Sequence, residues 1–124
     1  MIHKLNQVML YVDNPKSMAQ FWVNVMGFVQ IKETPYGENT CFIEIAASLD
    51  SETTLVLHDR GFVAGMNPNM NTAAPSLMFA SKDLPELQAK LRANGVTVGE
   101  IINIGIDTFN FADPEGNYFA VCRV

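Results

Sequence analysis

The sequence predicts an α+β fold made of two successive β-α-β-β-β modules. Residues 7–12 alternate with a period of two, which is typical of a strand, and a helical repeat of apolar residues follows. The same order of patterns begins again in the second half. Gln7 and Ser76, which start the two halves, are 69 positions apart, and the helix-ending Gly27 and Gly95 are 68 apart. A nearly constant offset indicates an internal duplication.

The first module is predicted to span residues 1–60. Asn14 and Pro15 supply an N-cap and a first helical residue, and Gly27 is placed to end the helix. Its buried face is predicted to carry Met18, Phe21, Trp22 and Val25, at helical spacing. Three further strands are expected at Phe28–Lys32, Thr40–Ala46 and Thr53–His58, with turns at 35–39 and 48–51.

Residues 61–74 are rich in Gly, Asn, Met and Pro, a composition that predicts a linker or a mobile lid between the modules. Met66 and Met70 would give such a lid an adaptable apolar surface.

The second module is predicted to span residues 75–124. After a strand at 76–81, Asp83 and Glu86 form a capping box at the start of a helix that ends at Gly95. Residues 113–116 have the composition of a type I turn. The remaining strands are expected at Val96–Ile104, Thr108–Ala112 and Tyr118–Val124.

Strand parity predicts which side chains face a ligand. Val8, Leu10 and Val12 suit the helix side of the first sheet, so the alternate residues point to the opposite face. That face is partly apolar in both modules, and we expect the two mixed sheets to curve around a groove, within one chain or between two chains. The predicted lining is Gln7, Met9, Tyr11, Val56, His58, Met78, Tyr118 and Ala120. No Lys or Arg occurs among these positions, which favours a flat, partly aromatic, neutral or cationic small molecule.

Composition and charge exclude several classes of partner. The net charge is −5 and there is no run of Lys or Arg, so nucleic acid and anionic membrane surfaces are not expected to bind. No apolar run approaches the ~20 residues of a membrane span, and no signal-peptide pattern is present, so a cytoplasmic location is expected. Cys41 and Cys122 are isolated and are predicted to be buried thiols without a disulfide.

Five short motifs follow one another along the chain: Val8–Asp13, Phe21-Trp22, Met26-Gly27-Phe28, Asn94-Gly95-Val96 and Phe111–Asn117. Together they resemble the vicinal oxygen chelate superfamily, which includes glyoxalase I, extradiol dioxygenases, fosfomycin-modifying enzymes and bleomycin-resistance proteins. The resemblance covers nearly the whole chain and implies the glyoxalase/bleomycin-resistance fold.

The resemblance also implies four metal-ligand positions, which fall at Gln7, Val56, Ser76 and Ala120. It thereby adds Ser76 to the predicted groove lining. Val and Ala have no donor atom, and a divalent ion needs about three protein ligands, so neither a metal ion nor another cofactor is predicted. An alternative site could be built from Gln7, His58 and Glu44, although Glu44 is expected to face solvent.

Three functions remain open on the sequence. The first is a metal-free protein that binds or sequesters a small organic molecule, as bleomycin-resistance proteins do. The second is a family enzyme of lyase, isomerase or dioxygenase type, either metal-independent or with a rebuilt metal site. The third is an accessory domain whose groove serves dimerisation. A homodimer is expected in any case, because two helices cannot cover the apolar faces of both sheets.

Overall fold

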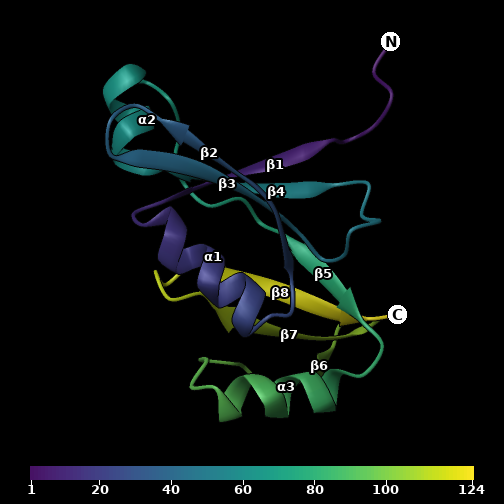
Figure 1. Cartoon of the computed structure of the whole chain (residues 1–124). Helices are drawn as coiled ribbons and strands as arrows, with labels where there is room; N and C mark the ends of the chain where they lie inside the picture. The colour runs from purple at the N-terminus through teal and green to yellow at the C-terminus, as the bar shows by residue number, and fades with distance from the viewer. The chain divides into compact units, whose positions relative to one another are not determined.

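The computed structural model describes all residues, 1–124, and confirms the predicted α+β fold with two β-α-β-β-β modules (Figure 1). The chain divides into two compact units, residues 1–74 and 75–124. In chain order the elements are β1 (Gln7–Val12), α1 (Pro15–Asn24), β2 (Val29–Tyr36), β3 (Thr40–Ala46), β4 (Thr54–Asp59), α2 (Arg60–Met66), β5 (Met78–Ser81), α3 (Leu84–Ala93), β6 (Ile102–Asn103), β7 (Asp107–Ala112) and β8 (Tyr118–Arg123).

The first unit contains a four-stranded mixed sheet in the order β1-β4-β3-β2. β1 and β4 are parallel, and the register pairs Met9 with Val56 and Tyr11 with His58. β3 runs antiparallel to both β4 and β2. Since paired residues point to the same side of a sheet, this register places the alternate residues of neighbouring strands in common rows.

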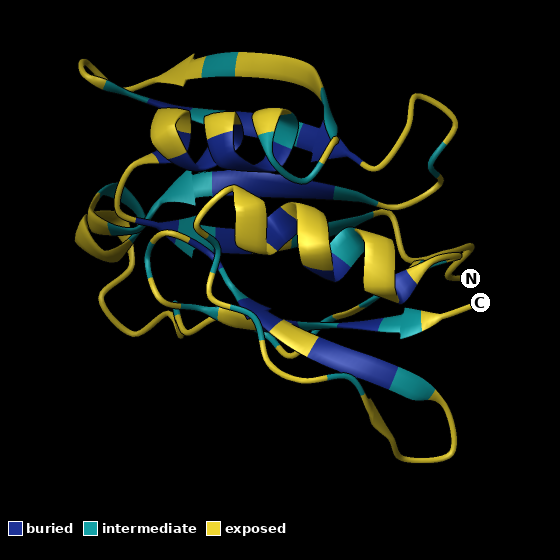
Figure 2. Ribbon diagram, turned by 90° about the horizontal axis from the view of Figure 1, so that it is seen from below, coloured by how far each residue is buried: buried dark blue, intermediate teal, exposed yellow.

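Helix α1 covers one face of this sheet. Asn14 caps the helix by accepting a hydrogen bond from the Ser17 N–H, and Pro15 follows as predicted. Trp22 and Met18 are fully buried, which confirms the predicted core role of this helix face. In Figure 2, α1 and α3 each carry buried and exposed residues on opposite sides. The other face of the sheet is therefore left to side chains that are not needed for the helix contact.

Two predicted boundaries in the first unit are wrong. β2 continues to Tyr36, so the turn is shorter than 35–39 and comprises only Gly37, Glu38 and Asn39. Pro35 is tolerated because β2 is an edge strand, where a missing N–H removes no bond of the sheet interior. Gly37 has a φ of +70°, a backbone conformation that favours glycine.

The second unit repeats the architecture with the strand order β5-β8-β7-β6. Asp83 caps α3 by accepting from the Glu86 N–H, as the capping pattern predicts. The Asp113–Gly116 turn is also confirmed, with a bond from the Gly116 N–H to the Asp113 carbonyl.

The predicted strand 96–104 is mostly wrong, because only Ile102–Asn103 forms a strand, and Val98 makes a single bridge to Phe111. The Gly99 carbonyl instead accepts from the Gln88 side chain, which ties this segment to α3. The predicted strand at 76–81 begins only at Met78.

Four phenylalanines form the aromatic core of the second unit. Phe111 contacts Phe79 and Phe119 with ring centroids 6.3 and 5.9 Å apart. Phe109 and Phe111 are fully buried, and they alternate along β7 with Asn110, which is exposed. Both rings therefore belong to the packed core of this unit.

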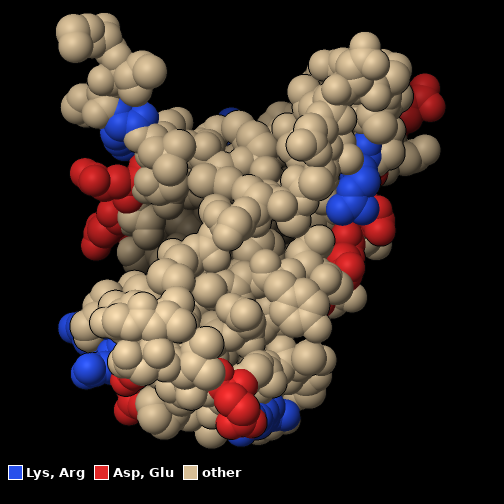
Figure 3. All heavy atoms as spheres, turned by 180° about the vertical axis from the view of Figure 1, so that it is seen from behind, with Lys and Arg blue, Asp and Glu red and all other residues tan.

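The structure has no membrane-spanning helix, and the face shown in Figure 3 has no extended basic area. No helix of the structure is long and apolar enough to cross a membrane. On the face shown in Figure 3, Lys and Arg are scattered, Asp and Glu lie among them, and much of the surface is uncharged.

Candidate functional site

A row of rings crosses the face of the first sheet that points away from α1. Tyr11 on β1 and His58 on β4 are register partners, with ring centroids 5.7 Å apart. Phe42 on β3 lies on the other side of His58, at 5.1 Å. The imidazole is therefore flanked by two aromatic rings, with interplanar angles of 30° and 31°.

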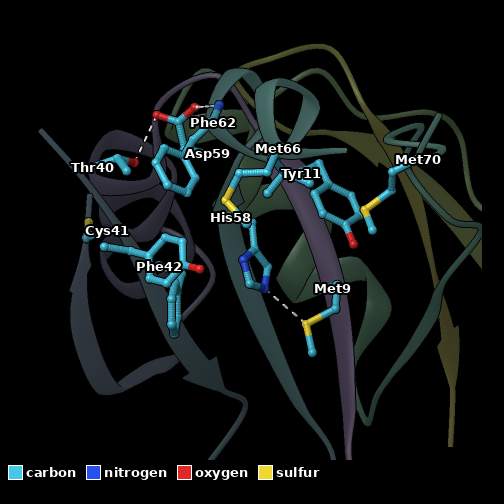
Figure 4. A pocket seen from close by; sticks show the side chains of 12 residues that line it. Met9, Tyr11, Thr40, Cys41, Phe42, His58, Asp59, Phe62, Met66 and Met70 are labelled. Atoms are coloured by element: carbon cyan, nitrogen blue, oxygen red, sulfur yellow. Dashed lines mark hydrogen bonds between the residues drawn. The ribbon is translucent and has the colours of Figure 1, made fainter. Parts of the chain in front are cut away.

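This row borders a cavity of about 410 Å³, which lies entirely within the first unit. Figure 4 shows side chains from β1, β3, β4 and α2 around it. Most of the lining is aromatic or sulfur-containing, so the cavity is apolar with few polar groups. The lining residues are Met9, Tyr11, Tyr36, Thr40, Cys41, Phe42, His58, Asp59, Phe62, Val63, Met66 and Met70.

Helix α2 forms one wall of this cavity, although residues 61–74 were predicted to be a linker or lid. Asp59 caps the helix by accepting from the Phe62 N–H at 2.9 Å, and its other carboxylate oxygen accepts from the Thr40 hydroxyl at 3.0 Å. Arg60 donates to the Tyr11 carbonyl at 2.8 Å and pairs with Asp13. These contacts attach the start of the helix to β1 and β3.

Phe62 joins α2 to the β2 end of the cavity. Its ring lies 4.9 Å from that of Tyr36, in an edge-to-face arrangement. A side chain at Gly37 would approach Phe62 to 2.7 Å, so the glycine leaves the room that this ring needs. The predicted apolar role of Met66 and Met70 agrees with their position in the cavity lining.

His58 is the titratable group at the centre of the ring row. Its Nε2 lies 3.2 Å from the Met9 sulfur, as Figure 4 shows. Desolvation by burial lowers the pKa of His58 below its usual value of 6.5. The neutral imidazole is therefore the main form at neutral pH.

A smaller pocket of about 230 Å³ adjoins the same row and is more polar. Glu44 lies in it and accepts from the Gln7 amide nitrogen at 3.1 Å and from the Thr54 hydroxyl at 2.7 Å. The expectation that Glu44 faces solvent is wrong, because its parity on β3 places it beside Gln7 and Thr54. Lys32 also lines this pocket, so the face does carry one cation, which the parity analysis missed on β2.

The structure brings five of the predicted site residues together in the first unit. These five line one or both of the pockets and are Gln7, Met9, Tyr11, Val56 and His58. In the second unit, Met78 and Ala120 are register partners on β5 and β8, and Tyr118 begins β8. Ser76 precedes β5 and lies outside any strand. The role of all nine residues in ligand binding stays a prediction.

The predicted groove lining omitted several residues, among them Glu44, which was considered only as part of an alternative metal site. Phe42 and Glu44 alternate with the buried Ile43 and Ile45, so applying the parity argument to β3 would have found them. Tyr36 and Phe62 gave no comparable signal, because the strand extension and α2 were not predicted.

The four family metal positions do not fit a metal ion. Val56 and Ala120 provide no donor atom, and the Gln7 amide nitrogen is directed to Glu44. The residues of the alternative set, Gln7, His58 and Glu44, line the same smaller pocket, but the Gln7 amide nitrogen donates to Glu44 and the His58 Nε2 lies beside the Met9 sulfur. The structure contains no group of three or more His, Cys, Asp and Glu side chains that could hold a metal.

Comparison with known proteins identifies the family of this chain. The model of the glyoxalase/bleomycin resistance protein/dioxygenase superfamily matches residues 4–121, and the chain belongs to that superfamily. The uncharacterized protein YetH of Bacillus subtilis strain 168 is 29% identical over 121 residues, which cover 96% of this chain and 97% of YetH.

Two solved structures with the same fold belong to proteins with different functions. One is TnmS3, an antibiotic binding protein from Streptomyces sp. CB03234, with a TM-score of 0.81, 23% identity, and coverage of 98% of this chain and 96% of TnmS3. The other is a lactoylglutathione lyase from Agrobacterium tumefaciens, with a TM-score of 0.74, 19% identity, and coverage of 98% and 94%. At these identities the likeness establishes the fold, and function has to be argued from the site.

Proposed function

We propose that this protein binds and sequesters a small, partly aromatic organic molecule without a metal ion. The observation that carries the proposal is the apolar cavity of about 410 Å³ beside the Tyr11–His58–Phe42 row. Its volume lies within the range typical of small-molecule sites, roughly 300–1,000 Å³. The antibiotic-binding function of TnmS3 supports the same class of activity.

The lining favours flat ligands for a physical reason. An aromatic contact contributes about 0.5–1.5 kcal/mol beyond the burial of area, and five rings border this cavity. They are Tyr11, Tyr36, Phe42, His58 and Phe62. Met9, Met66 and Met70 add flexible, polarizable side chains that adapt to ligands of different shape.

The test begins with a thermal-shift screen of aromatic antibiotics and metabolites, because a ligand that binds only the folded state raises its stability. Calorimetry of a hit should then show binding weakened about tenfold in Tyr11→Ala, through lost stacking and area. Leu49→Ala is the matched control, since Leu49 is 79% exposed in a turn outside the cavity lining. Equal affinity in all three proteins would reject this site.

A second arm separates binding from catalysis. Each hit is incubated with the protein, with and without added divalent metal, and the mixture is analysed for conversion. The proposal expects the ligand to be recovered unchanged and the protein, purified without a histidine tag, to hold well under one equivalent of metal. Turnover of a hit would favour the alternative of a family enzyme.

A further inference from the structure

We infer that Glu44 makes the binding site selective for aromatic molecules that carry an amine or another charged nitrogen donor. This inference rests on the proposed function and specifies its ligand class. The decisive feature is that the polar pocket and the ring-lined cavity form two parts of one site. Met9, Phe42 and His58 line both, so a ligand stacked on the ring row reaches the polar pocket beside it.

Glu44 is held in position by its own hydrogen bonds. The Gln7 amide and the Thr54 hydroxyl both donate to the same carboxylate oxygen, Oε2. The Gln7 donor comes from β1 and the Thr54 donor from β4. In the sheet, β4 lies next to β3 and β1 lies beyond β4. A carboxylate can accept about four hydrogen bonds, so the second oxygen, Oε1, retains its capacity for a ligand donor. The orientation is established before a ligand arrives, which lowers the entropic cost of binding.

The charge of the pocket favours a cation despite the presence of Lys32. Lys32 is exposed on the edge strand β2 and makes no ion pair with Glu44, although the two are register partners. Water screens an exposed ammonium more strongly than a half-buried carboxylate. The net charge of −5 adds a weak attraction in the same direction. A ligand ammonium at Glu44 would form a charge-assisted hydrogen bond, the stronger kind.

The experiment uses three probes with one ring system and different polar groups: 2-naphthylmethylamine, 2-naphthylmethanol and 2-naphthoate. Calorimetry at pH 7.5 should rank the amine first, about tenfold tighter than the naphthoate, which is the effect of roughly one charge-assisted hydrogen bond. Glu44→Gln should weaken amine binding about tenfold and leave 2-naphthylmethanol unchanged. Glu33→Gln is the matched control, because it removes the same charge from β2 outside both pockets and should change nothing.

Lys32→Met provides a second variant in case Glu44→Gln does not fold. It replaces an exposed side chain, and the inference predicts that the preference for the amine is kept or increased. The inference is overturned if the three probes bind wild type equally, if Glu44→Gln binds the amine as wild type does, or if Lys32→Met abolishes the preference. In each of these cases the proposed function stands, because the rings still bind. If neither the naphthalenes nor any library compound binds, the proposed function itself fails and the inference with it.

Discussion

At the scale of single residues, His58 stands out because its ionisable imidazole lies in apolar surroundings. Tyr11 and Phe42 flank its ring and the Met9 sulfur lies at its Nε2. An imidazole in such surroundings loses more hydration as a cation than as a neutral ring, and burial therefore lowers its pKa. The folded protein then binds a proton at this position less readily than the unfolded chain does.

Acid should destabilise the folded state through His58. Because the folded pKa is depressed, the contribution of His58 is fully present above the unfolded pKa of about 6.5. It is lost as the pH falls from there through the folded pKa. Urea unfolding at pH 8 and pH 5 should show a larger loss of stability in wild type than in His58→Phe, which keeps a ring and cannot titrate. An equal loss in the two proteins would contradict this assignment.

At the scale of elements, α2 is a short helix that the tertiary structure has to maintain. It has seven residues and contains Gly61 and Gly65, so it would be marginal in isolation. Asp59 and Arg60 attach its start to the sheet, and Phe62 packs on Tyr36. The cavity wall therefore depends on a few identifiable contacts.

Asp59→Ala should loosen α2 while the first sheet stays folded. The change removes the N-cap and the Thr40 bond, with an expected loss of about 1 kcal/mol in the helix. Hydrogen exchange should become faster at the Phe62 amide and in the following turn. Asp59→Asn should restore protection, since asparagine caps helices equally well. Unchanged exchange in Asp59→Ala would show that the cap does not stabilise α2.

The turn between β7 and β8 depends on the buried carboxylate of Asp113. Asp113 is 5% exposed and accepts from the backbone N–H groups of Glu115 and Asn117 and from the Asn117 side chain. Asp113→Ala should lower the free energy of unfolding by about 2–3 kcal/mol, measured by urea denaturation. The exposed Asp50 is the control, and Asp50→Ala should change stability by less than about 0.5 kcal/mol. A similar small effect at both sites would disprove the role assigned to the turn.

At the scale of the whole molecule, we expect a homodimer. Several large apolar side chains around β6 stay exposed in the single chain, namely Ile102, Ile104 and Ile106. Two-fold association is the commonest way for a small domain to bury such surface. Light scattering at micromolar concentration should give twice the 13.7 kDa mass of one chain. A mass of 13.7 kDa across the concentration range would refute the expectation.

Much of the fold follows from local patterns in the sequence. The period of two in residues 7–12 and 40–46 and the helical spacing around Trp22 specify which side of each element is buried. The caps at Asn14 and Asp83 mark the helix starts, because they depend on residues only three positions away. The internal duplication can likewise be detected from the sequence alone. These features account for the confirmed architecture and for five site residues placed together.

The tertiary structure decided the rest of the site, because it depends on contacts between distant segments. Parity on β3 specifies the face on which Glu44 lies, but its hydrogen bonds form only where β1 and β4 bring the donors of Gln7 and Thr54 beside it. Helix α2 is stabilised because Phe62 packs against Tyr36, a residue 26 positions earlier in the chain. No local periodicity encodes these contacts between distant residues, because their free energy comes from burial and hydrogen bonding that exist only after the strands have paired. The ring row and its polar neighbour are for this reason properties of the folded sheet.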